Sequence, residues 1–176
     1  TPGVIDWFSI IIGVIAVVTL AIHGANWIIL KTNSSINKKL KNVIYRLNIL
    51  LLVLTIISLL VWQIVNPNSL DNFINKPFLI LFPLIYFSGL IGLFFIKKIK
   101  KDLYGFMMST LLILGGITSS LASLFPVILP STNEINESLT IYNTATTEYG
   151  LSIGLCWGIF GIILVIFYVI IQKKFL

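Results

Sequence analysis

The sequence predicts an all-α fold, a polytopic helical membrane bundle of five transmembrane helices with the N-terminus outside and the C-terminus in the cytoplasm. Of the 176 residues, 57% are hydrophobic and only 10% are charged, whereas a soluble domain has about 25% charged residues. Uncharged runs of about 20 residues, the length that crosses a bilayer's hydrocarbon core, recur along the chain. We therefore expect residues 1–176 to form a single membrane domain.

Five apolar runs form the predicted spans, and each is bounded by charged residues or by Asn and Pro. Every backbone amide and carbonyl in lipid must be paired within the protein, and these runs lack the alternation of barrel strands, so we expect helices. The spans cover residues 7–30, 47–65, 78–96, 103–129 and 151–171, and residues 130–149 form the predicted outer loop.

The distribution of charge predicts the orientation. If the five spans alternate in direction, eleven of the twelve basic residues fall on one side, with Lys76 the exception. Five of the six acidic residues fall on the other side, with Asp102 the exception. An excess of Lys and Arg in short loops is typical of the cytoplasmic side. Basic clusters beside apolar runs also explain the net charge of +6 without a nucleic-acid partner.

His23, the only histidine, lies inside the first span, where an ionisable side chain is by default a functional hypothesis. It could be an axial haem ligand, although the candidate second ligands, Met107 and Met108, are poorly placed for this. The alternative, which we favour, is a neutral His23 that hydrogen-bonds a neighbouring helix, with Gly24 and Ala25 permitting its close approach. From the residues alone we assign no catalytic residue, no cofactor-binding residue and no metal ligand.

Two stretches carry a resemblance to a known family. The first is His23-Gly-Ala-Asn-Trp-Ile-Ile-Leu-Lys-Thr32, and the second is Phe125-Pro-Val-Ile-Leu-Pro-Ser-Thr132, which leads into Ser138-Leu-Thr140. They resemble the C-terminal half of subunit II of the cytochrome bd-type quinol oxidases, with matching order and spacing over essentially the whole chain. The family's N-terminal half is missing from this sequence. We therefore expect either a truncation or a split subunit completed by a separate polypeptide.

The resemblance implies a haem-free scaffold subunit, or half-subunit, of a terminal oxidase in a bacterial or archaeal cytoplasmic membrane. In such a complex, a partner subunit I holds haem b and haem d, quinol is oxidised and oxygen is reduced to water. The motif positions are then expected to serve helix packing and loop shape. They are His23, Gly24, Ala25, Lys31, Thr32, Pro126, Pro130, Ser131, Leu139 and Thr140.

Other interpretations remain open from the residues. Quinone or lipid could lie against the aromatic residues Phe82, Tyr86, Phe94 and Phe95, because flat apolar ligands suit such surfaces. The prolines inside the spans also fit a membrane transporter component, in which broken helices meet near the midplane. A non-respiratory membrane assembly protein would need no more than the charge-poor spans.

Overall fold

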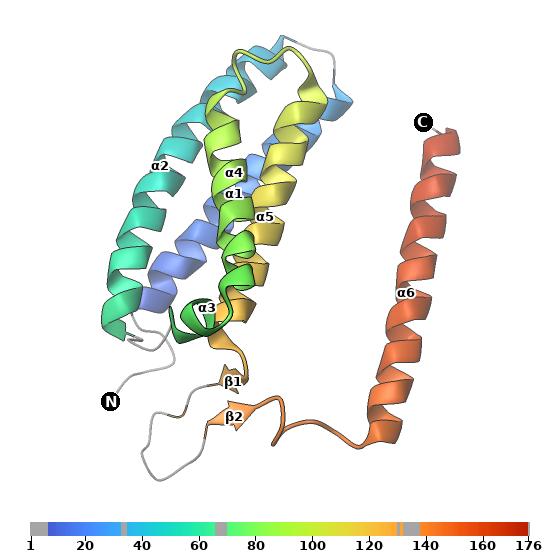
Figure 1. Ribbon diagram of the computed structural model, residues 1–176. Helices are drawn as coiled ribbons and strands as arrows, with labels where there is room; N and C mark the ends of the chain where they lie inside the picture. Colours follow the sequence, from blue (N-terminus) through green and yellow to red (C-terminus); the bar gives the residue numbers. More distant parts are fainter. Residues whose placement is uncertain (1–6, 33–34, 66–69, 130, 132–137, 176) are drawn as a thin grey trace. The chain divides into compact units, whose positions relative to one another are not determined.

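The computed structural model describes residues 7–32, 35–65, 70–129, 131 and 138–175. Within these residues the elements follow in the order α1, α2, α3, η2, α4, α5, β1, β2 and α6, where η2 is a 3-10 helix (Figure 1). Five helical segments of the described chain are long and apolar enough to cross a membrane. The predicted all-α membrane bundle of five spanning helices is therefore confirmed. The chain divides into two compact units, residues 1–125 and 126–176.

Among the described residues of the first unit, four long helices pack together (Figure 1). They are α1 (Trp7–Lys31), α2 (Ile36–Val65), α4 (Leu81–Phe94) and α5 (Asp102–Leu124). The short α3 (Asp71–Asn75) and η2 (Pro77–Ile80) connect α2 to α4 at one end. The start of α2 and the α4–α5 connection lie together at the other end (Figure 1). α1 packs against α2 and α5, and α4 packs against α5 and α2.

A narrow apolar core runs through this bundle. Most other large apolar side chains of the four helices are exposed, as expected for helices whose outer faces meet lipid. The core residues come from all four helices and the start of the α4–α5 connection. They are Val18, Ile22, Ile29, Ile44, Leu51, Leu90, Leu93, Ile96 and Leu112.

The most extensive helix contact is between α4 and α5, and glycines make it possible. A Cβ atom added at Gly89 would lie 2.6 Å from the carbonyl oxygen of Met108 and 2.7 Å from the amide nitrogen of Leu112. A Cβ atom added at Gly115 would collide with the backbone of Tyr86. Small residues let helix backbones approach closely in membranes. Both glycines are therefore required for this packing distance.

α5 ends at Leu124, whereas the sequence predicts a span that reaches residue 129. The cause is Pro126, because a proline disfavours helical backbone at the residue before it and has no amide proton. Phe125 accordingly has φ −53° and ψ 134°, outside the helical region. Residues Val127–Leu129 then form the strand β1 instead of a last helical turn.

The C-terminal carbonyls of α5 receive hydrogen bonds from α3. The side-chain amide of Asn72 donates to the carbonyls of Ala122 at 3.0 Å and Ser123 at 3.1 Å, and it also contacts the carbonyl of Phe125. The last carbonyls of a helix have no partner within the helix. Asn72 supplies that partner from a segment about 50 residues earlier in the chain.

In the second unit, residues 126–176, the described residues form a two-stranded antiparallel sheet and one long helix. β1 (Val127–Leu129) pairs with β2 (Leu139–Thr140), and α6 (Glu148–Phe175) follows. The sheet occupies the predicted end of the fourth span and part of the predicted outer loop. Sequence reasoning missed it because each strand is too short to show an alternating pattern.

Candidate functional site

Polar and aromatic side chains gather around His23 where α1 packs against α5. Nδ1 of His23 lies 2.9 Å from Oγ of Ser109, and that hydroxyl donates to the carbonyl of Phe106 at 2.9 Å. A hydroxyl has only one proton. Donation to Phe106 requires the His23 tautomer with its proton on Nδ1, whereas the other tautomer accepts the hydroxyl proton at Nδ1. His23 is thus hydrogen-bonded to a neighbouring helix.

A cluster of tilted aromatic rings flanks this hydrogen bond. The ring of Phe106 lies 4.8 Å from that of His23 and 5.5 Å from that of Trp27, measured between centroids. Nζ of Lys31 lies 5.0 Å from the centroid of Trp27. A cation over an indole face is attracted by the ring's quadrupole. Lys31, in the last turn of α1, therefore contacts the cluster at Trp27.

Asn26 completes the contact between α1 and α5. Its side chain is 1% exposed, and its amide donates to the carbonyl of Ile22 at 3.0 Å. A Cβ atom added at Gly105 of α5 would collide with Oδ1 of Asn26. Asn26 belongs to the first motif but was assigned no role from the sequence, although its position three residues after His23 on one helix face was a usable signal. Ser109 gave no such signal, because it is 86 residues away.

The possible haem ligands do not come together. Met108 lies against Gly92 in the contact between α4 and α5, whereas His23 lies in the contact between α1 and α5. Met107 is 49% exposed. Within the described residues there is also no group of three or more His, Cys, Asp or Glu side chains that could hold a metal ion. This donor set does not fit a haem bound through two axial ligands.

The remaining residues of the first motif shape the end of α1. Oγ1 of Thr32 lies 2.8 Å from the carbonyl oxygen of Ile28, and the amide of Asn37 in α2 donates to the carbonyl of Thr32. Ala25 packs against the apolar core. The sequence predicts a close helix approach at Gly24 as well, but a Cβ atom added there meets no atom within 4 Å. The glycine-dependent approach of α1 is at Gly105 instead.

The second motif shapes the sheet of the second unit. The carbonyl of Pro126 accepts a hydrogen bond from the amide of Ile141 at 3.0 Å. The amide of Ser131 donates to Oγ of Ser138 at 3.0 Å. These contacts hold the two arms of the loop at a fixed separation. Pro130 lies outside the described residues.

Leu139 and Thr140 form β2, in register with Leu129 and Val127 respectively. The turn that follows is closed by Asn143, whose Oδ1 accepts from the amide of Thr140 at 2.7 Å. Asx side chains commonly stabilise turns in this way. The motif positions of this stretch thus take part in main-chain structure.

The aromatic side chains considered for quinone or lipid contact are divided between the bundle interior and its surface. The hydroxyl of Tyr86 lies 2.7 Å from Oγ1 of Thr55 in α2. The ring of Phe94 meets Tyr45 of α2 edge-on, with centroids 5.8 Å apart. Phe95, beyond the end of α4, is 45% exposed. Tyr86 and Phe94 therefore contact α2, whereas Phe95 is exposed.

The residues of the two motifs take part in helix contacts of the first unit and in the sheet of the second unit. The family of cytochrome bd terminal oxidase subunit II matches residues 2–174. The chain belongs to this family. The subunit II resemblance of the two motifs is thereby confirmed, and the five apolar helices make the chain a multi-pass membrane protein.

A similar curated protein is the "Probable cytochrome oxidase subunit 2" of Haemophilus influenzae (strain ATCC 51907 / DSM 11121 / KW20 / Rd). It is 25% identical over 190 residues, an alignment that covers 93% of this chain and 50% of the relative. The chain thus spans about half the length of the relative that it matches. In this member of the subunit II family, the polar and aromatic side chains around His23 form contacts between α1 and α5.

Replacing Ser109 with Ala is expected to lower the free energy of unfolding by about 1 kcal/mol, because His23 loses its partner on α5 inside the membrane. Unfolding in mixed micelles, followed by circular dichroism, measures the change. Ser120→Ala on the same helix is the matched control, since its exposed hydroxyl bonds only the local carbonyl of Gly116. Equal losses in the two variants would exclude the interhelical bond as the cause.

Proposed function

We propose that the chain is a haem-free supporting subunit, or part of one, in a cytochrome bd-type terminal oxidase. The complex oxidises quinol and reduces oxygen to water in a respiratory chain. The observation that carries the proposal is the match of the subunit II family over residues 2–174. The chain spans about half the length of its relative, and the oxidase activity is proposed for the complex rather than for this chain alone.

The role of this chain in that assembly is structural support, on the basis of what its polar side chains do. His23 bonds Ser109 across the α1–α5 contact, and the amide of Asn48 in α2 donates to the carbonyl of Leu90 in α4 at 3.0 Å. Interhelical hydrogen bonds of this kind stabilise helix association in membranes. A bundle joined in this way supplies a fixed surface for a partner.

The partner in this proposal is a haem-bearing subunit I that holds haem b and haem d. The relative also contains a region that this chain does not match. In this proposal, the equivalent region of subunit II contributes the rest of the scaffold, either in the same polypeptide or in a separate one. The assembly lies in a bacterial or archaeal cytoplasmic membrane, with the N-terminus of this chain outside. The lysine-rich connections then face the cytoplasm, as the excess of basic residues in short loops indicates.

The test is to solubilise native membranes, purify through a tag on this chain, and record the reduced-minus-oxidised spectrum of the eluate. We expect bands of haem b and haem d, together with quinol oxidase activity. Membranes carrying the untagged chain, taken through the same purification, are the control. An intact complex without haem bands would contradict the proposal and would favour the transporter or assembly interpretation.

A further inference from the structure

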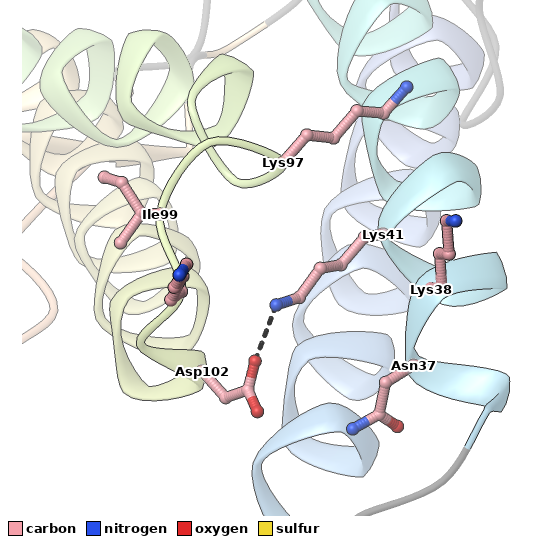
Figure 2. A pocket seen from close by; sticks show the side chains of 7 residues that line it. Asn37, Lys38, Lys41, Lys97, Ile99 and Asp102 are labelled. Atoms are coloured by element: carbon pink, nitrogen blue, oxygen red, sulfur yellow. Dashed lines mark hydrogen bonds and ion pairs between the residues drawn. The ribbon is translucent and has the colours of Figure 1, made fainter.

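A pocket opens at one end of the first unit, between the start of α2 and the α4–α5 connection (Figure 2). Its volume is about 420 Å³. Both walls belong to the first unit, one from the start of α2 and the other from the α4–α5 connection and the start of α5. The lining residues are Asn37, Lys38, Lys41, Lys97, Ile99, Lys100 and Asp102.

The pocket carries an excess of positive charge. Four lysines and one aspartate line it, which leaves a formal charge of +3. Nζ of Lys41 forms an ion pair with Asp102 at 2.6 Å, as Figure 2 shows. Within the described residues, neither Lys38 nor Lys100 has an ion-pair partner. Their two ammonium groups are therefore available to an anion from outside the chain.

The two walls are held at a fixed separation. The Lys41–Asp102 pair joins α2 to the first residue of α5 and spans 61 positions of sequence. Nζ of Lys97 lies 4.1 Å from the ring centroid of Tyr45, which joins the α4–α5 connection to α2 a second time. These two contacts fix the walls of the pocket, so that the four lysines that line it stay close together although their charges repel one another. Such an arrangement is electrostatically unfavourable unless counterions or a bound anion compensate it.

We propose that this pocket binds a phosphate-bearing anion. Lysine ammonium groups bind phosphate oxygens as point charges with three donors each. The pocket lies at the ends of membrane-spanning helices, the level at which lipid headgroups are found, and basic pockets between such helices bind anionic headgroups. The anion is the phosphate of an acidic phospholipid or free inorganic phosphate, and these sources share the same recognition chemistry. The proposal does not depend on the oxidase assignment.

The experiment is native mass spectrometry of the detergent-solubilised complex, titrated with phosphatidylglycerol and separately with phosphatidylcholine. The test variant is Lys38→Gln with Lys100→Gln, which leaves the Lys41–Asp102 pair intact. The control variant is Lys39→Gln with Lys98→Gln, which removes the same charge from the same two segments but from residues that do not line the pocket. Circular dichroism checks that both variants keep the helical content of the parent protein.

We expect the parent protein and the control variant to retain phosphatidylglycerol in preference to phosphatidylcholine. The test variant should lose phosphatidylglycerol affinity by on the order of twentyfold, since each lysine near an anionic lipid surface contributes roughly a fivefold factor. Full competition by millimolar inorganic phosphate would identify free phosphate as the source, whereas competition by phosphatidylglycerol alone identifies the lipid. Equal weakening in both variants, or no preference for the acidic lipid and no phosphate binding, would overturn the proposal.

Discussion

Gly89→Val is expected to break the contact between α4 and α5 and to lower the free energy of unfolding by about 3 kcal/mol or more. The added side chain would meet the backbone of α5, where a Cβ atom would already lie 2.6 Å from the carbonyl oxygen of Met108. Overpacking usually costs about 1–3 kcal/mol when side chains can move. Here the obstacle is backbone, so the helices themselves must separate.

The measurement for Gly89 is reversible unfolding in mixed micelles of mild detergent and dodecyl sulfate, followed by circular dichroism. Gly13→Val in α1 is the matched control, because a Cβ atom added at Gly13 meets nothing within 4 Å. We expect the control to stay within about 0.5 kcal/mol of the parent. If the two variants unfolded at the same detergent fraction, the close approach of α4 and α5 would not be a source of stability.

Asn72→Asp is expected to destabilise the first unit by about 2–3 kcal/mol at neutral pH. The carbonyls of Ala122 and Ser123 would lose the amide that donates to them and would face a negatively charged acceptor of the same size. An unpaired buried carbonyl costs about 1–3 kcal/mol, and a carboxylate can only accept. Asn75→Asp, on the same short helix, is the control because the Asn75 side chain is exposed and forms no hydrogen bond within the described residues.

The pH dependence distinguishes the loss of a donor from a general effect of charge. The carbonyls disfavour the ionised form of the introduced carboxyl, so its pKa in the folded state is raised above the unfolded value of about 4. The penalty is then fully present above the folded pKa and decreases as pH falls below it, because the protonated carboxyl again offers a donor. A pH-independent loss in thermal unfolding from pH 7 to pH 4 would contradict this explanation.

The sequence alone determined the class of fold, with five apolar spans, although the second run covers only residues 47–65 of α2, which begins at Ile36. The run that predicts a span over 7–30 corresponds to α1 at Trp7–Lys31, and the fifth run lies within α6 at Glu148–Phe175. Such predictions succeed because lipid imposes a local requirement, namely enough consecutive apolar residues with all backbone groups paired inside the helix. The two motifs also predicted the family, because they combine unusual residues at fixed spacing.

The tertiary structure decided which helix faces meet. It selected Ser109 as the partner of His23, placed the close approach of α1 and α5 at Gly105 rather than at Gly24, and brought lysines of α2 to those of the α4–α5 connection. These contacts join positions tens of residues apart, and their partners follow from the rotation and neighbours of each helix. A run that is apolar all round gives no sign of its inner face, since lipid and protein interior are equally apolar surroundings.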